Sequence, residues 1–597
     1  MSPLRHLRRD ETRANSTPQW CPSFLALACL VLLGTHSAAA AVADTSDPAV
    51  NVRGSYWYDW GWYGAYPRKS YESFGAESPL INIVKQDERC DDGLIFFEPR
   101  GAYVETPGPV VIDNDGNLIW TETKWGQAMD LKAQRYKGKD YITFWRGTDR
   151  GGFAGGEGSY IMLDDKYEVF KEIKPIGGLT GDLHEFRITD EDTIIMTMYE
   201  STKGDMHEYG MDEGWIFDCL FQEINIETGE LIFEWRASDV YPIHESMQPL
   251  FNTGGYPDNG FDFFHINSVD KDANGDYLIS ARHMCAVACI SHVDGSILWQ
   301  LGGVRNSFTD LSDGAATNFT WNHHASWHSN TTLTIFDNGS NGQVVSAAHS
   351  RGIMVEVDLD KMTAKAIHQY MPALDLLTPS QGSVQILPND NVLVGWGHTP
   401  AFTEYTMDGE VLCDTHFGVI WLANFGWSKS YRTFKFPWVG RPNTLPSVAV
   451  RPNKGAVFVS WNGATEVDRW LLQSGRSADE DAEFSDHEDV PKTTFETRIP
   501  IPADARQYLR VAALDRNGDV LAYSKPVSRN ERTVINLTDA PWRGWKPEPF
   551  TIFMWSLSAF VVLVATVYRF RGHLTRAVRR AVGRGVTAHR YEPLPVQ

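Results

Sequence analysis

One apolar frame recurs along this chain with different polar residues at the same two places, and it limits the fold more than any other feature. Phe264-His265-Ile266-Asn267 is followed, after an apolar stretch and a turn, by Ser280-Ala281-Arg282. The same layout places Asp182-Leu183-His184-Glu185-Phe186 before 193–196, Asn322-His323-His324-Ala325 before 333–336, and Ser380-Gln381-Gly382-Ser383 before 391–394. Equivalent apolar positions with variable polar ones predict repeated strands that surround a common centre.

A second pattern, in which a strand, a turn and another strand follow one another, alternates with the first. It is clearest over 110–120, 223–235 and 290–299, and weaker copies occupy 160–170, 354–367 and 403–412. Asp-Gly or Thr-Gly between alternating apolar residues favours a β-hairpin. The hairpins recur at intervals of roughly 45 to 65 residues, a spacing typical of propeller blades with variable loops.

Together the two patterns predict an all-β fold in which two hairpins form each blade of a six-bladed β-propeller over residues 85–440. An array of β-sandwiches is the alternative. In a propeller the first strand of each blade lines the central channel. We therefore expect His184, His265, His323 or His324, and Gln381 or Ser383 to converge there. The second strands would supply Arg146, Tyr199, Arg282, His349 and Trp396.

The character of the chain changes after Pro437. Short strand-like stretches and the turn Asn517-Gly518 predict a small immunoglobulin- or fibronectin-like β-sandwich over 445–530. The acidic stretch 475–490 is interpreted as a solvated, mobile loop. This region contains no evident catalytic cluster, so we expect a spacer or a support for the propeller.

Both ends of the chain resemble membrane signals. Residues 1–43 combine arginines, an apolar run and small residues, which indicates a signal peptide or an uncleaved signal-anchor. Residues 550–568 contain no charged side chain, and 569–597 form a basic tail. This pattern predicts a transmembrane helix with a cytosolic tail and a lumenal or extracellular body, in the secretory pathway or the plasma membrane.

The formal net charge of −22 limits the partners of the chain. A body this acidic repels nucleic acid and anionic membrane surfaces, so no nucleic-acid partner is expected. Anionic substrates need local arginine and histidine side chains to overcome the acidic field over about 8–10 Å.

Secretion makes the cysteines and the glycan acceptor motifs informative. The body holds Cys90, Cys219, Cys285, Cys289 and Cys413, an odd number, so at least one is free or pairs between chains. Cys285 and Cys289 lack companion zinc ligands. N-glycan acceptor motifs begin at Asn318, Asn330, Asn338 and Asn536, which predicts a glycoprotein.

Over about 85–525 the motifs resemble the arylsulfotransferase family, in its eukaryotic, mostly fungal, membrane-bound branch. The resemblance rests on Cys90-Asp91-Asp92-Gly93, Pro99-Arg100-Gly101, the four histidine- and glutamine-containing motifs above, Asp337-Asn338-Gly339 and 460–466. The sequence departs from the family pattern at Asn322, where Gln is usual, and at Ser326, where Arg is frequent.

The resemblance implies a six-bladed propeller that moves a sulfuryl group from an aryl sulfate to a phenol without a nucleotide sulfate donor or another cofactor. It implies that His323 is the nucleophile and forms a sulfohistidine, with His324 as an adjacent alternative. It also implies that His184, His265, Asn267 and Arg282 bind the sulfuryl oxygens and handle the proton, and we add Arg146, His324 and Gln381 as substrate-binding candidates.

These residue types suit that chemistry. A neutral imidazole attacks an anionic sulfate without adding charge, and a guanidinium offers planar donors to sulfate oxygens. Two alternatives remain. One is a non-catalytic binding or adhesion propeller. The other is a hydrolase or lyase that holds zinc through His184, His265 and His323, although no metal is our expectation. Donor, acceptor and oligomeric state are not evident from the sequence.

Overall fold

The computed structural model describes residues 50–149, 156–479, 481–533, 555–566 and 568–569. Residues 48–552 form one compact unit, and residues 1–47 with 553–597 form a second unit that is considered by itself. In the second unit, 555–566 are helical. The described residues contain no helix that is both long and apolar enough to cross a membrane. The predicted signal, the first part of the predicted transmembrane segment and nearly all of the basic tail lie outside the described residues.

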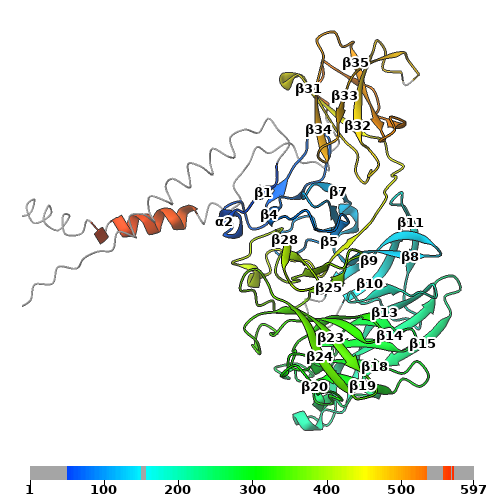
Figure 1. Ribbon diagram of the computed structural model, residues 1–597, viewed down its shortest axis with the longest axis vertical. Helices are drawn as coiled ribbons and strands as arrows, with labels where there is room; N and C mark the ends of the chain where they lie inside the picture. The colour runs from blue at the N-terminus through cyan, green and yellow to red at the C-terminus, as the bar shows by residue number, and fades with distance from the viewer. Residues whose placement is uncertain (1–49, 150–155, 480, 534–554, 567, 570–597) are drawn as a thin grey trace, which may run out of the picture. The chain divides into compact units, whose positions relative to one another are not determined.

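Strands dominate the larger unit, and the protein is mostly β (Figure 1). Within the described part of residues 94–436, six sheets each contain an antiparallel run of four strands. Three of these runs are β5 (Leu94–Phe97), β6 (Val110–Ile112) and β7 (Leu118–Thr121) with β29 (Thr433–Phe436); β8 (Ala128–Tyr136) with β9 (Lys139–Asp149), β10 (Gly156–Leu163) and β11 (Val169–Ile173); and β12 (Phe186–Ile188) with β13 (Thr193–Gly204), β14 (Gly214–Asn225) and β15 (Leu231–Arg236).

The other three runs follow in chain order. They are β16 (Ile266–Lys271) with β17 (Tyr277–Ala281), β18 (Ala286–Ile290) and β19 (Ile297–Gly302); β21 (His323–Ser329) with β22 (Thr332–Asp337), β23 (Arg351–Asp358) and β24 (Thr363–Tyr370); and β25 (Ser383–Ile386) with β26 (Val392–Gly395), β27 (Ala401–Tyr405) and β28 (Val411–His416). In five of these sheets the four strands are neighbours in the sequence and form a meander, whereas in the first sheet β29 joins β5, β6 and β7 from far along the chain. Two of the sheets carry additional strands at an edge.

The hairpins predicted from the second sequence pattern are confirmed. Val110 of β6 pairs with Thr121 of β7, and Ile290 of β18 pairs with Ile297 of β19. The turn of the second hairpin contains Gly295 at a φ of 74°, a left-handed conformation in which glycine is unstrained. Local turn chemistry thus determines where these strands reverse.

Strands far apart in the sequence close the arrangement. β29 pairs with β5 in antiparallel register, with Thr433 opposite Phe97, although more than three hundred residues separate them. The first strands contact one another in turn: β8 with β12, β16 with β21, β21 with β25, β25 with β29, and β29 with β8. Sheets whose first strands meet around a common centre, with a late strand completing an early sheet, are typical of a β-propeller.

Paired charges fill part of this centre. Arg432 is completely buried and donates to Asp130 at 2.6 Å and to Glu185 at 3.1 Å. Lys132 contacts the same two carboxylates at 2.9 and 2.7 Å. Buried charges persist only when they are paired, and removing one partner of such a group costs about 3–5 kcal/mol. This network ties β8, β12 and β29 together beside the histidine motifs.

Two further sheets follow Phe436. One contains β30 (Ser447–Arg451), β31 (Ala456–Ser460) and β34 (Glu496–Pro500), and the other β32 (Arg469–Gly475), β33 (Phe484–Pro491), β35 (Tyr508–Leu514) and β36 (Val520–Tyr523). Both contribute to one apolar core that includes Val457, Trp470 and Val511. The interpretation of 475–490 as a mobile loop was wrong for its second half, because β33 pairs with β32 and leaves its acidic side chains in solvent.

The predicted glycan acceptors differ in exposure, and the body cysteines differ in pairing. Asn318 and Asn330 are exposed, and Asn536 lies outside the described residues. Asn338 is fully buried, and its Nδ2 donates to two backbone carbonyls, so the prediction of a glycan there was wrong. Cys90 and Cys413 form a disulfide, while the other three body cysteines are free and buried.

Candidate active site

The histidines singled out in the repeat occupy equivalent places before or at the first strand of successive sheets. His184 precedes β12, His265 immediately precedes β16, and His323 begins β21. The ring centroids of His184 and His265 lie 4.8 Å apart, and those of His265 and His323 lie 6.4 Å apart. Side chains that lie far apart in the sequence therefore meet in one cluster. All three are buried, with exposed fractions between 2% and 5%.

The backbone bends sharply where these sheets begin. His265, His324 and Gln381 have φ values of 57°, 47° and 67°. Residues other than glycine rarely adopt this left-handed conformation, which costs on the order of 1–3 kcal/mol at each position. The surrounding sheets hold the three residues in it. Backbone strain of this kind collects at functional sites, and here it recurs where three of the sheets begin.

Hydrogen bonds determine which nitrogen of His323 carries the proton. Asn338 Nδ2 donates to the carbonyls of Thr378 and Gln381, both at 3.0 Å, so its Oδ1 faces His323 as an acceptor. His323 Nδ1 lies 2.7 Å from that oxygen and must be the donor. Nε2 consequently carries a lone pair, which accepts the backbone N–H of Gln381 at 3.1 Å. The ring is a neutral imidazole with its nucleophilic nitrogen on the side of Gln381.

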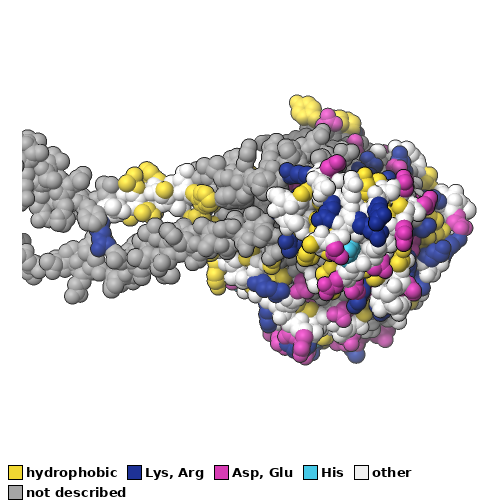
Figure 2. Space-filling view, turned by 90° about the horizontal axis from the view of Figure 1, so that it is seen from above, with side chains coloured by type: hydrophobic (Ala, Val, Ile, Leu, Met, Phe, Trp, Pro, Cys, Tyr) yellow, Lys and Arg dark blue, Asp and Glu magenta, His cyan; other side chains and the backbone are white. Residues whose placement is uncertain are grey.

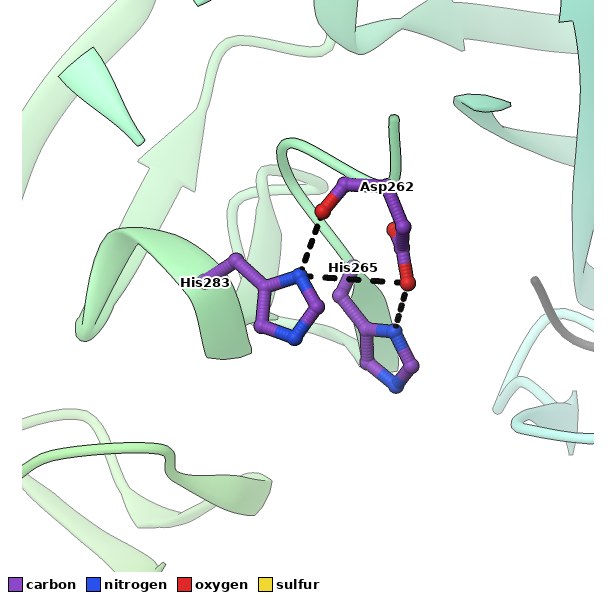
Figure 3. A group of neighbouring side chains, drawn as sticks. All are labelled: Asp262, His265 and His283. Carbon is purple, nitrogen blue, oxygen red and sulfur yellow. Dashed lines mark hydrogen bonds and ion pairs between the residues drawn. The ribbon is translucent and has the colours of Figure 1, made fainter. Parts of the chain in front are cut away.

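Carboxylates orient the other two histidines in the same way. His184 Nδ1 donates to Asp182 Oδ2 at 2.6 Å, and His265 Nδ1 donates to Asp262 Oδ2 at 2.5 Å. His283 joins the second pair, because its Nδ1 donates to the backbone carbonyl of Asp262 at 2.6 Å (Figure 3). A carboxylate at Nδ1 fixes the tautomer and leaves Nε2 free to act as a base or an acceptor.

Burial and neighbouring cations keep His323, His265 and His283 neutral. Burial, followed by the charge of Arg282, holds the pKa of His323 well below its usual value. Burial also lowers the pKa of His265 strongly and that of His283 to about 3. Burial raises the pKa of Asp262 to about 6, against the opposing charges of His283, His184 and Arg282. Near neutral pH His323, His265 and His283 are therefore neutral, and Asp262 is ionised.

Arg282 supplies positive charge at the same place. It lies directly after β17, and its Nη2 donates to the carbonyl of Pro379 at 2.6 Å. Burial lowers its pKa to about 10, which leaves the guanidinium charged at neutral pH. Its buried Nε has no hydrogen-bond partner within the described residues. A buried donor without a partner favours a ligand or water that completes it.

Asn267 and Gln381 bond to the motif of His323 through the backbone, Asn267 to a carbonyl and Gln381 through its own N–H. Asn267 Nδ2 donates to the carbonyl of Asn322 at 2.7 Å, and its Oδ1 has no partner in the described part of the chain. Gln381 meets His323 through its backbone N–H, while its buried Oε1 has no partner among the described residues. Both side chains keep polar capacity that a substrate could use.

Two predicted residues lie apart from the cluster. The Nδ1 of His324 accepts from the backbone of Val384, and its ring lies against Phe434, on the side of Arg432 and Glu185. Arg146 is exposed, and its guanidinium lies 5.6 Å from the ring centroid of Trp125. Neither placement brings the side chain to His323. Adjacent residues of a strand point to opposite faces, which separates His324 from His323.

Several residues of the cluster were missed by the sequence analysis as functional candidates. Asp262 and His283 complete the carboxylate–histidine group, and the ring of Tyr431 lies 5.6 Å from that of His184, as does the ring of the expected Tyr199. The sequence did contain a signal for the two carboxylates that bind these histidines. An aspartate precedes His184 by two residues and His265 by three, at corresponding points of the repeat.

The metal alternative named His184, His265 and His323 as zinc ligands. In the described residues the group at this site with potential ligand atoms close together is instead Asp262, His265 and His283. Both histidines use Nδ1 as a donor to Asp262, so the nitrogens nearest the carboxylate are occupied (Figure 3). The geometry fits oriented imidazoles better than a ligand set for a cation.

Comparison with solved structures gives only distant likenesses. A protein of unknown function from Bacteroides caccae is 12% identical, covering 58% of this chain and 99% of that chain with a TM-score of 0.33. The Dos1 propeller is 11% identical, with 64% and 76% covered and a TM-score of 0.27. Virginiamycin B lyase from Staphylococcus aureus is 10% identical, with 59% and 87% covered and a TM-score of 0.22. At these sequence identities and TM-scores, the likenesses indicate neither the fold nor the function of this chain.

The family comparison is more informative. No curated protein matches the chain. Residues 132–418 match the family model of arylsulfotransferase (ASST), a region just under half of the chain. His184, His265, Arg282 and His323 all lie within it. The match supports the arylsulfotransferase family for the region that carries the histidine cluster.

Proposed function

We propose that this protein is a sulfotransferase-like enzyme that moves a sulfuryl group from an aryl sulfate to a phenol through a sulfohistidine at His323. The observation that carries the proposal is the state of His323 itself. Its Nδ1–H is bound to Asn338, its Nε2 holds a lone pair, and the charged Arg282 lies nearby. A buried neutral imidazole beside a guanidinium suits attack on an anionic sulfur centre.

The first half-reaction forms a bond between His323 Nε2 and sulfur while the bond from sulfur to the aryl oxygen breaks. The electron pair leaves with the phenolate. We assign to Arg282 and to Asn267 Nδ2 the stabilisation of the charge that develops on the sulfuryl oxygens, and preorganised donors of this kind contribute about 3 kcal/mol each. Attack requires that Nε2 give up its bond from the Gln381 backbone, so residue 381 must shift when substrate enters.

The second half-reaction transfers the sulfuryl group to an acceptor phenol and regenerates neutral His323. The acceptor must lose its proton as its oxygen attacks sulfur. His184 and His265 have free Nε2 lone pairs because their Nδ1 atoms are bound to Asp182 and Asp262. Either can take the proton, which later leaves with the phenolate of the next donor, a step worth roughly 10²–10⁴-fold. No nucleotide donor is needed in this cycle.

The finer points of the fold and the cellular setting belong to the same proposal. Five four-stranded meanders, and a sixth sheet that β29 completes by pairing with β5, support a six-bladed propeller. The two later sheets support a small β-sandwich. Membrane anchoring through 550–568, a lumenal or extracellular body and membership of the fungal branch stay predictions from the sequence. A non-catalytic binding propeller is the second candidate, and the near-complete burial of the histidines favours it over an open catalytic pocket.

The test is phenol release from 4-nitrophenyl sulfate by the purified protein, with and without a phenolic acceptor. We expect His323→Gln to lower transfer at least about a thousand-fold, as removal of a nucleophile does. His324→Gln examines the neighbouring ring, and the exposed His292→Gln is the matched control. Digestion of protein quenched during turnover should give a peptide in which residue 323 carries the sulfuryl group. Unchanged transfer in His323→Gln would exclude the mechanism, and no transfer in the wild type would favour the binding propeller.

A further inference from the structure

A second group of basic side chains, Arg100, His398 and Lys429, lies beside the candidate active site. Arg100 and Lys429 belong to two segments that pair through their backbones, with N–H···O distances of 2.9 and 2.8 Å between the two residues. His398 lies between β26 and β27, and its ring is 3.4 Å from the position that a Cβ on Gly426 would take. We call these three residues the basic cluster.

The basic cluster has more positive charge than its carboxylates neutralise. Arg100 Nη1 pairs with Asp149 at 3.1 Å. Burial and the charge of Asp130 raise the pKa of Glu98 to about 8, so Glu98 adds little negative charge near pH 7. Burial and the charge of Arg100 lower the pKa of Lys429 to about 8, which still leaves most of it protonated at neutral pH.

Two members of the basic cluster also have buried polar atoms without partners. Arg100 has an exposed fraction of 4%, and its Nε makes no hydrogen bond to any described residue. The same holds for both ring nitrogens of His398, although the backbone of Asn424 lies close enough to affect its pKa. Burial and then the charges of Lys429 and Arg100 lower that pKa to about 4. Cations that repel one another around unsatisfied donors are the features of an anion site.

Three consecutive residues join the basic cluster to the histidine cluster. The carbonyl of Pro379 accepts from Arg282, the carbonyl of Ser380 accepts from the backbone of His398, and the backbone N–H of Gln381 donates to His323. The two groups are therefore opposite sides of one short segment. A shift of residue 381, which the proposed attack requires, would move the segment that separates them.

Aromatic rings border the same segments. Tyr103 and Trp427 lie 5.4 Å apart between centroids, and Phe425 stacks on Trp427 at 5.6 Å. Tyr103 follows Arg100 by three residues, and Trp427 precedes Lys429 by two. Phe425 is 69% exposed. Aromatic side chains next to cations suit a ligand that combines a ring with an anionic group.

We propose that Arg100, His398 and Lys429 form a second anion subsite, which binds an additional sulfate, sulfonate, carboxylate or phosphate group of an aromatic substrate held at His323. This inference rests on the proposed function, because it names the class of aryl sulfate that the site prefers. The preferred substrates are aromatic compounds with two anionic groups, one transferred and one retained.

The test measures binding to the full-length protein by calorimetry, so that it does not depend on turnover. Benzene-1,3-disulfonate and benzenesulfonate serve as probes, since their sulfonates are attached through carbon and cannot be transferred. We expect the disulfonate to bind roughly ten-fold more tightly than the monosulfonate, the effect of one charge-assisted contact. Lys429→Gln should remove most of that advantage without changing the affinity for benzenesulfonate. The exposed Lys139→Gln is the matched control, and His398→Gln is the second variant if Lys429→Gln does not fold.

Inorganic sulfate distinguishes a substrate group from a free anion. If Lys429→Gln weakens sulfate binding while the two sulfonates bind the wild type equally, the subsite takes free anions and the proposed substrate class is overturned. Equal affinities that no variant changes overturn the subsite altogether. A disulfonate advantage that depends on Lys429 supports it even if no sulfuryl transfer is detected, and that result would refute the proposed function alone.

Discussion

At the scale of single residues, the chemistry of the site depends on what each imidazole Nδ1 contacts. His323 donates to a neutral amide oxygen, whereas His184 and His265 donate to carboxylates. A carboxylate stabilises an imidazolium that forms on the same ring, and an amide does so far less. Within the proposed mechanism, this difference suits His323 to attack as a neutral ring and suits His184 and His265 to accept a proton in passing.

Asp262 gives this difference a measurable pH dependence. Its pKa is raised to about 6 by burial, so it becomes protonated as the pH falls through 6 and can no longer accept from His265. We expect initial rates of sulfuryl transfer to fall below pH 6 in the wild type. Asp262→Asn should lower the rate on the order of 10²-fold and remove this acid limb between pH 5 and 7.

Asp182→Asn is the matched comparison for that experiment. Burial alone would raise the pKa of Asp182, but the charge of His184 and the hydrogen bonds to the carboxylate lower it below its usual value. Its protonation therefore falls outside the window from pH 5 to 7, and Asp182→Asn should be slower yet keep the acid limb near pH 6. An acid limb that persists in Asp262→Asn would assign it to another group.

At the scale of elements, the local hairpins were predictable and the long-range closures were not. Alternating apolar residues around Gly295 specify the hairpin of β18 and β19 within ten residues. No local signal indicates that Thr433 lies opposite Phe97, because strand pairing at that separation depends on the whole sheet arrangement. The pairing of β4 (Asn82–Lys85) with β28 is another such contact, and it lies before the predicted start of the propeller at 85.

The same limit applies to the candidate site. The repeat revealed His184, His265 and His323, because their equivalent positions in the sheets follow from the spacing of the pattern. It could not reveal that Arg146 faces solvent over Trp125, since that depends on the loops around β9. It also could not distinguish the sides on which His323 and His324 lie before the left-handed turn at His324 was known.

The disulfide joins elements from the two ends of the closed arrangement, and its removal should weaken that closure. Cys90 precedes β5, Cys413 lies in β28, and 323 residues separate them. Linking residues so far apart restricts the unfolded chain strongly, so we expect Cys90→Ala with Cys413→Ala to lower the free energy of unfolding by about 2–5 kcal/mol. Urea unfolding with and without a reductant measures this.

A reductant should shift the wild-type midpoint to that of the double variant and leave the double variant unchanged. Cys289→Ala is the control, since Cys289 is buried and free. It reports the cost of losing a buried sulfur without a crosslink. If the reductant does not change the wild-type midpoint, the disulfide does not contribute to the closure.

At the scale of the larger unit, the two sheets after Phe436 are attached to earlier parts of the chain by specific contacts. Glu496 accepts from the backbone and the hydroxyl of Ser73, and Tyr167 donates to the carbonyl of Gly463 at 2.8 Å. Acidic and basic side chains are interspersed over the face shown in Figure 2. On that face negative charge is not gathered into one patch.

Phe495 tests whether these two sheets support the site or take part in it. Its ring packs 4.7 Å from Tyr71 and 5.1 Å from Phe74, and it belongs to an apolar cluster with Phe97 and Phe417 of the repeat sheets. We expect Phe495→Ala to lower the free energy of unfolding by about 3–5 kcal/mol, through lost contacts and the cavity that remains. The exposed Leu521→Ala should change it little.

Sulfuryl transfer at 25 °C should be unchanged in Phe495→Ala while the protein stays folded, because none of its contacts reaches the histidine cluster or the basic cluster. Melting followed by tryptophan fluorescence, with rates measured well below the transition, separates the two effects. A rate that falls in the folded variant would mean that the later sheets act on the site itself. A loss confined to stability would assign them the role of a support, which keeps the first strands, and with them the strained residues His265 and Gln381, in position.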